Sequence, residues 1–403
     1  MARLYLKMQS SSINFYLTKK VPRFICLLLL AYFFSASVIE AQILSVPDED
    51  DRQGGVHYSL VPVLGYSSDT GLIGGVVLQR FNYGDGRSPF LSNLKADFTI
   101  STKADLISEL NYERTRLFGR DIRSEYSVIA ERYKRANYFG IGNETEFSSQ
   151  LYDQDYYFFE KRVIEVVARY RKTVAEYGFE GNFDGFIQFG FSYLDASDQA
   201  EESLFATEQP VGDNRQLLNS FGFGVIAEDR DSEFNPTEGY RYEAGIEFSG
   251  PYTGSEFNYA KVHLQLRNYV EVLPKIVIAQ KIEGTHLMGD APFWKRSSLA
   301  DKYGLRGYYK DRFLGDSSIL HILEARSWLF SLFEDEIRLG GQLFWDSGRV
   351  FSNNDSNRFF DNWKSTYGFG GAISIYNPDF IMRGDIGFSD ESTQIYIGIG
   401  YTF

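Results

Sequence analysis

The chain has almost no cysteine, since its 403 residues include only Cys26. Cys26 lies inside the apolar run Phe24 to Phe34, which we interpret as part of a secretory signal, where a thiol acts as a small apolar side chain. The residues after this signal then have no thiol at all. Disulfides, zinc–cysteine sites and catalysis by a cysteine nucleophile are therefore excluded together.

Long apolar runs and excess positive charge are also missing. Mean hydropathy is −0.28, and after the N-terminal region no run approaches the roughly 20 apolar residues that a membrane-spanning helix needs. The net charge is −13, which argues against a nucleic-acid partner because no basic surface would meet the phosphates.

Enzyme signatures are equally scarce. The four histidines, His57, His263, His286 and His321, lack the spacing of metal ligands, and no H-E-x-x-H, P-loop or G-x-S-x-G motif occurs. The GFGG at Gly368 to Gly371 falls inside an expected strand. We therefore expect no enzyme, no cofactor and no metal. A membrane lipase that uses His263 stays open as an alternative.

Aromatic residues and glycine are abundant, with 28 Tyr, 35 Phe and 37 Gly. This composition without an apolar run is typical of an outer-membrane barrel, because each strand is apolar on one face only. Composition alone fits a large soluble β-sandwich or propeller equally well.

Alternation with a period of two continues from about Gly55 to Phe403 and predicts half-buried strands. Ala260, Val262, Leu264 and Leu266 alternate with charged and polar residues. In the last strand, Ile395, Ile397, Ile399, Tyr401 and Phe403 form the apolar face. Sixteen strands are expected near residues 57–66, 71–82, 91–101, 104–114, 121–132, 155–171, 184–195, 216–228, 239–250, 256–272, 275–286, 317–331, 335–348, 365–376, 379–388 and 393–403.

The connections between these strands are unequal in length. Those near 133–154, 196–215, 287–316 and 349–364 are long, whereas Tyr376-Asn377-Pro378-Asp379 is a tight turn. Long loops at one end and short turns at the other are typical of outer-membrane barrels, with the long loops outside the cell. We therefore expect an all-β fold, a transmembrane β-barrel of about sixteen antiparallel strands. An even number of strands places both chain ends in the periplasm.

The stretch Tyr303 to Phe330 carries Leu305-Arg306-Gly307-Tyr308, followed by a strand with Glu324-x-Arg326. This pattern resembles the BamA/TamA outer-membrane assembly superfamily, also called bacterial surface antigens. The resemblance implies that the long loop holding Arg306, Gly307 and Tyr308 folds into the lumen, and that Arg306 pairs with Asp346. Alternation places Asp346 on the lumen face independently. The alternative is a solvated arginine in an extracellular loop.

Further charged residues are expected on the lumen face. Glu324 and Arg326 share one face of their strand, as do Arg383 and Asp385, and we expect cross-strand ion pairs that neutralise charge in the lumen. Arg338 is expected on the same face as Asp346. The turn from Asp229 through Pro236 to Gly239 resembles a periplasmic turn of the family.

The last strand carries a second signal. Tyr396, Gly398, Tyr401 and the terminal Phe403 match the pattern by which assembly machinery recognises barrel substrates. Gly398 and Gly400 are expected to weaken the contact between the last strand and the first, since glycine packs little surface. In the family this seam opens sideways, and an incoming strand is added at its edge.

We predict a signal peptide at 1–41, a flexible acidic leader at 42–54 and the barrel at 55–403, without the POTRA domains or the patatin-type lipase of some relatives. The function implied by the resemblance is insertion or translocation of protein, or of lipid, in the outer membrane of a Gram-negative bacterium. The expected partners are outer-membrane lipid and other outer-membrane or periplasmic proteins. A passive channel narrowed by its inward loop is the alternative.

Overall fold

The computed structural model describes residues 55–67, 70–85, 89–176, 181–196, 200–301, 304–333, 336–352, 359–375 and 381–403. All the described residues belong to one compact unit, Leu44–Phe403. The predictions for the signal, the leader, Tyr303 and the turn at 376–379 lie outside the described residues.

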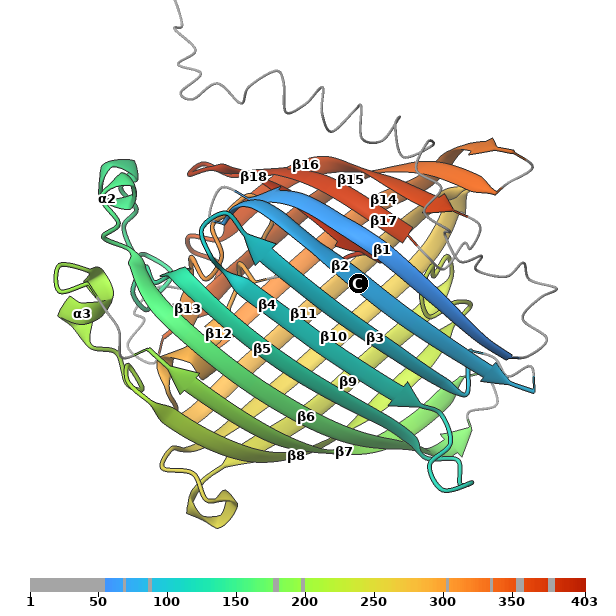
Figure 1. Ribbon diagram of the computed structural model, residues 1–403, viewed down its shortest axis with the longest axis horizontal. Helices are drawn as coiled ribbons and strands as arrows, with labels where there is room; N and C mark the ends of the chain where they lie inside the picture. The colour runs from blue at the N-terminus through green and yellow to red at the C-terminus, as the bar shows by residue number, and fades with distance from the viewer. Residues whose placement is uncertain are drawn as a thin grey trace, which may run out of the picture. The chain divides into compact units, whose positions relative to one another are not determined.

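One antiparallel sheet of sixteen strands makes up the fold (Figure 1). Each long strand pairs with the next one along the chain, so the topology is up-and-down. The strands are β1 (Gly55–Ser67), β2 (Gly71–Gly84), β3 (Ser92–Ser101), β4 (Leu106–Arg114), β5 (Arg123–Asn137), β6 (Phe158–Glu176), β7 (Asn182–Asp195), β8 (Gln216–Arg230), β9 (Gly239–Ser249), β10 (Asn258–Leu273), β11 (Ile276–Asp290), β14 (Ser317–Leu332), β15 (Ile337–Phe351), β16 (Lys364–Ile375), β17 (Ile381–Phe388) and β18 (Thr393–Ile399).

The prediction of an all-β barrel is confirmed, and each of the sixteen expected strands overlaps one observed strand. The short elements in the loops were not predicted, because stretches of two to five residues leave no periodic signal. They are α2 (Ser149–Asp153), α3 (Leu204–Glu208), η2 (Pro251–Thr253), η3 (Phe293–Lys295), β12 (Ser297–Ser298) and β13 (Leu314–Gly315).

The two faces of the wall differ as alternation predicts. In β15, Leu343 and Trp345 point outward and are 65% and 45% exposed, whereas Gln342 and Asp346 are buried inside. No helix among the described residues has the length and the apolar character needed to cross a membrane.

The sheet curls until β18 returns to β1 (Figure 1), and Cα atoms of the two strands come within 8 Å. The ladders of the large sheet run from β1 to β18 in order, and among the described residues none joins β18 back to β1. Between the described residues of β1 and β18, the wall is therefore not closed by a ladder as it is elsewhere.

The expectation that Tyr401 and Phe403 continue the outer face of the last strand is wrong. The strand ends at Ile399, and Gly400 adopts φ +83°, a left-handed conformation that glycine accepts without strain. The last residues consequently turn into the barrel, where Phe403 is buried.

Candidate functional site

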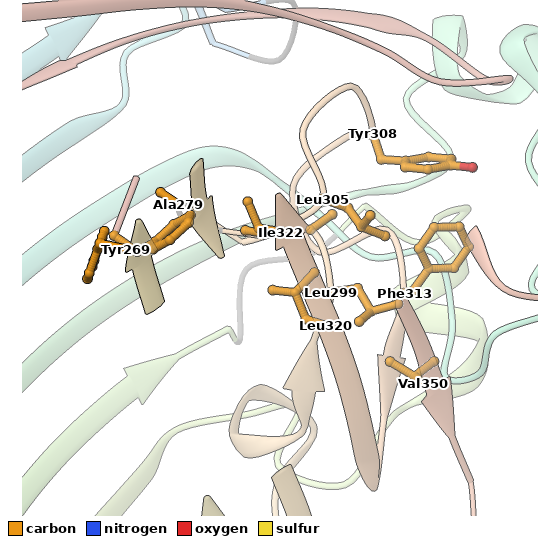
Figure 2. Close-up of a cluster of buried hydrophobic side chains, with 11 residues drawn as sticks. Tyr269, Ala279, Leu299, Leu305, Tyr308, Phe313, Leu320, Ile322 and Val350 are labelled. Atoms are coloured by element: carbon orange, nitrogen blue, oxygen red, sulfur yellow. The ribbon is translucent and has the colours of Figure 1, made fainter. Parts of the chain in front are cut away.

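The long connection between β11 and β14 folds into the barrel and packs on its inner wall. Leu299, Leu305 and Phe313 of this connection, hereafter the inward loop (residues 291–316), are buried against Ile322 and Val350 of the wall (Figure 2). Burying a side chain of this size stabilises by roughly 1.5–3 kcal/mol. The loop is therefore held by an apolar contact, in addition to its polar ones.

Arg306 is the charged centre of this contact. Its Nε and Nη2 donate to the two carboxylate oxygens of Asp346, each at 2.8 Å, and its backbone N–H donates to the same group at 3.2 Å. Nη1 lies 2.6 Å from Glu324 and 3.5 Å from Asp385. The guanidinium stacks on Phe344, with Cζ 3.4 Å from the ring centroid. A bidentate pair of this kind fixes both the position and the orientation of the arginine.

Five of the six charged side chains in this cluster are buried and Arg383 is half-buried, and the charges of the six side chains balance. The cations are Arg306, Arg326 and Arg383, and the carboxylates are Glu324, Asp346 and Asp385. Loss of any one member leaves an excess charge inside the wall, and a buried charge without a partner is costly.

The pair of Glu324 with Arg326 and the pair of Arg383 with Asp385 each form along one strand, whereas cross-strand pairs were expected. Arg326 Nε donates to Glu324 at 2.8 Å within β14, and Arg383 lies 2.9 Å from Asp385 within β17. Alternate residues of one strand share a face, which brings the two side chains together. Arg338 lies farther along β15, where it is half-buried and paired in register with Ser331 and Ser374.

Gly307 brings the loop backbone directly onto β17. Its φ is +102°, and a Cβ atom on it would lie 2.8 Å from the carbonyl carbon of Phe388. Its N–H donates to the hydroxyl of Tyr396 at 2.9 Å. Its carbonyl oxygen accepts from Ser389 at 2.9 Å and from Ser392 at 2.6 Å. The loop backbone is thereby bonded to β18 and to the connection that precedes it.

Tyr308 and Arg312 extend these contacts toward the outer loops. The Tyr308 hydroxyl donates to Asp390 at 2.6 Å, and burial, followed by this hydrogen bond, raises the pKa of the phenol, which therefore stays a donor. Arg312 is 1% exposed, donates to Glu391 at 2.6 and 2.7 Å, and bonds the hydroxyl and carbonyl of Thr145 at 2.6 Å. The connection after β5 is thus linked to the inward loop.

The C-terminal residues reach the same cluster from the other side. Arg326 Nη2 donates to a backbone oxygen of Phe403 at 3.2 Å, and its Cζ lies 4.0 Å from the Tyr401 ring centroid. Thr402 accepts from Arg306 at 3.3 Å. Gly398 stays on the lumen face, where a Cβ would lie 3.7 Å from Arg383. The loop, the wall and the chain end therefore share one charge cluster.

A second connection folds inward at the opposite end of the barrel. The connection between β8 and β9 folds inward, so that both Arg123 nitrogens Nη1 and Nη2 donate to the carboxylate of Glu233 at 2.8 Å. Phe234 contacts Phe81 of β2 edge to face, with ring centroids 6.2 Å apart. This connection, which resembles a periplasmic turn of the family in sequence, contacts both β2 and β5.

His263 lies in the lumen, as alternation predicts, with Nε2 3.2 Å from Glu243. Arg169 and Arg241 contact the same carboxylate, which makes this a further ion cluster of the wall. Among the described residues no group of His, Cys, Asp and Glu is arranged to hold a metal ion.

Several important residues were missed by sequence reasoning. Gly387, Thr402 and Arg312 carry no motif signal, because their roles depend on contacts between segments far apart in the chain. The Asp385 contact with Arg306 could have been suggested by the lumen face of β17, which alternation already provided.

A family model for the Omp85 superfamily domain matches residues 92–403. Among solved structures, the chain is similar to BamA from Haemophilus ducreyi lacking POTRA domains 1–3, at 14% identity and TM-score 0.53, covering 92% of this chain and 78% of that one. It is also similar to CdiB from Acinetobacter baumannii, at 12% identity and TM-score 0.51, covering 87% of this chain and 66% of that one.

CdiB from Escherichia coli is similar at 11% identity and TM-score 0.55, covering 86% of this chain and 62% of that one. The chain thus spans less than two thirds of either CdiB chain. At these identities the likeness to the three structures concerns the fold alone. No curated protein matches the sequence.

Proposed function

The chain belongs to the Omp85 superfamily, and on that premise we propose that it is an outer-membrane insertase or translocase of a Gram-negative bacterium. Its substrate class is an unfolded outer-membrane protein, which enters the bilayer through the seam between β1 and β18. Its partners are outer-membrane lipid and other outer-membrane or periplasmic proteins.

The seam carries this proposal. In the described residues β1 and β18 approach within 8 Å without a ladder between them. An unpaired strand edge is costly in hydrocarbon, where water cannot satisfy its backbone groups. The same edge is a template for an incoming strand, which would gain a complete set of hydrogen bonds on pairing.

The inward loop supports the same proposal, because it lies across the axial path. It is bonded to β15 through Arg306 and Asp346, and to β18 through Gly307 and Tyr396. A passive channel needs an open lumen and gains nothing from an unpaired seam. The seam therefore favours lateral insertion over the rival passive channel.

The test uses a pair of cysteines across the seam, one within residues 58–63 of β1 and one within β18, in a chain from which the signal with Cys26 has been removed. The protein is placed in liposomes, and the folding rate of a urea-denatured barrel protein is measured from its heat-modifiable fraction. We expect oxidation of the pair to abolish the acceleration and a reductant to restore it.

A matched control joins two strands that stay paired. Leu60 of β1 and Leu78 of β2 face each other in the ladder and are both exposed on the outer face, so Leu60→Cys with Leu78→Cys forms a bridge beside the seam. Oxidation of this control should leave the acceleration unchanged. Full acceleration with the seam bridged would overturn the proposal.

A further inference from the structure

A groove lies on the outer face of the wall, over β10, β11 and β14. Its volume is about 410 Å³, which is within the range of small-molecule sites. The apolar side chains that line it are Val262, Leu264, Ile319, Phe351 and Phe359. These residues face away from the lumen cluster, and the groove is open along its length.

Gly284 creates the hollow. In the ladders it is paired with Leu264 on one side and with Ile319 on the other, so it is the one position in this row of three that lacks a side chain. A Cβ atom added to Gly284 would meet nothing closer than the carbonyl oxygen of Ser318, at 3.9 Å. Neither backbone strain nor a tight contact requires glycine here, and the glycine leaves the groove empty.

The groove is polar at one end only. His286 and Ser317 are paired in register at the loop end of β11 and β14, and His286 Nδ1 lies 2.7 Å from the Ser317 hydroxyl. Toward the middle of the strands the groove is lined by Leu264 and Ile319. If the long loops face outward, the polar end lies at the depth of the outer headgroups and the apolar end lies in the hydrocarbon.

One side of the groove is held in place by a buried arginine. Arg349 donates from Nη1 to the carbonyl of Phe359 at 3.4 Å, and its Cζ lies 4.9 Å from the Phe351 ring centroid. Phe351 and Phe359 stack on each other, with centroids 5.4 Å apart. The rings of Phe351 and Phe359 therefore form one fixed side of the groove.

We propose that this groove binds one acyl chain of an outer-leaflet lipid, with the headgroup of that lipid at His286 and Ser317. The shape, the apolar lining and the single polar end match an amphiphile that enters along the membrane normal. A soluble polar ligand would find no partners over most of the groove. The inference depends on the outward orientation of the long loops and is independent of what the seam does.

The experiment measures lipid retention by native mass spectrometry, with lipid A added as the probe to the purified, folded protein in detergent. Wild type is expected to retain one lipid per chain. Gly284→Leu fills the groove and should lower retention about ten-fold, which corresponds to about 1.4 kcal/mol. Gly284→Ala, a smaller filling, should give an intermediate loss and serves if the leucine variant fails to fold.

The matched control is Gly371→Leu. Gly371 is also an outward, exposed strand glycine with no atom closer than 3.9 Å to an added Cβ, but it does not line the groove. This variant should retain lipid like the wild type, and heat-modifiability checks that each variant is folded. Equal retention by wild type and Gly284→Leu, or equal loss in both leucine variants, would overturn the proposal. A wild-type dimer that Gly284→Leu dissociates would assign the groove to a second copy and would overturn it too.

Discussion

Gly307 of the inward loop and Gly387 of β17 meet backbone to backbone. A Cβ on Gly387 would lie 2.8 Å from the backbone nitrogen of Gly307, and a Cβ on Gly307 would lie 3.0 Å from the carbonyl carbon of Gly387. Real Cβ atoms essentially never lie closer than 3.0 Å to another atom, a Cβ on Gly307 would also lie 2.8 Å from the carbonyl carbon of Phe388, and all these neighbouring atoms are backbone. The docked position of Arg306 beside Asp346 therefore requires glycine on both sides of the contact.

The first prediction concerns Gly387→Ala. The added methyl group has no room while the loop is docked, and overpacking of this kind typically costs about 1–3 kcal/mol. We expect a lower unfolding midpoint and faster protease cleavage within the inward loop.

Gly371→Ala is the control, because its nearest atom would be 3.9 Å away. It should behave like the wild type. If Gly387→Ala is as resistant to protease as the control, the loop does not depend on this backbone contact.

The wall could be predicted because its signal is local. A period of two in apolar residues is repeated in every strand, and the turn lengths follow from the gaps between the repeats. The same alternation placed Asp346 and Glu324 on the lumen face, where both are fully buried. Neither inference required knowledge of any contact between distant segments.

The inner contacts could not be predicted in the same way. Gly387 resembles any other strand glycine until the loop is docked against it. The turn at Gly400 redirects Tyr401 and Phe403, and alternation alone continues the strand past it. The contact between Glu233 and Arg123 joins residues more than one hundred positions apart and leaves no trace in the pattern of either segment.

The second prediction is that two inward-folded segments limit ion flow through the barrel. They are the inward loop at one end and the connection between β8 and β9 at the other. Arg306→Ala removes the cation that binds Asp346 and Glu324, and loss of one partner of a buried pair costs about 3–5 kcal/mol. Single-channel conductance in planar bilayers should then show wider openings, as it should for Asp346→Ala. We expect the steady current to stay small while Glu233 is still bound to Arg123.

Combining Glu233→Ala with Arg306→Ala should raise the current beyond the sum of the two single changes, because the two inward-folded segments lie in series along the lumen. Arg306→Lys is the matched control, since lysine keeps the charge and loses the bidentate geometry. It should give an intermediate frequency of openings. Wild-type currents in the double variant would show that neither contact narrows the pore.

The third prediction separates packing from recognition at the C-terminus. Phe403 lies inside the barrel against Tyr269, with ring centroids 6.2 Å apart, and Tyr269 is itself 1% exposed. Phe403→Ala and Tyr269→Ala should both lower the thermal stability of the folded barrel, because each leaves a cavity worth about 3–5 kcal/mol. Only Phe403→Ala alters the proposed C-terminal signal.

Assembly in cells therefore distinguishes the two variants. The amount of folded barrel in the outer membrane should fall much further for Phe403→Ala than for Tyr269→Ala at equal thermal stability. Equal amounts would mean that the terminal residue acts by packing alone.

The fourth prediction concerns a polar pair on the outer face. The Gln280 amide donates to His321 Nε2 at 3.0 Å, and the His321 ring meets Trp345 edge to face at 5.4 Å. His321 alternates along β14 with buried residues of the lumen face, so His321 and its partner Gln280 face lipid. There each side chain supplies the other with a hydrogen-bond partner. His321→Leu should change the free energy of unfolding little. The gain from removing one polar group from the lipid face is offset by the loss of the hydrogen-bond partner of the Gln280 amide.

The double variant Gln280→Leu with His321→Leu should be more stable than either single variant. A double-mutant cycle, measured by urea unfolding in liposomes, should give a coupling free energy between the two side chains of about 0.5–1.5 kcal/mol. Additive effects would mean that the two side chains do not support each other in the bilayer.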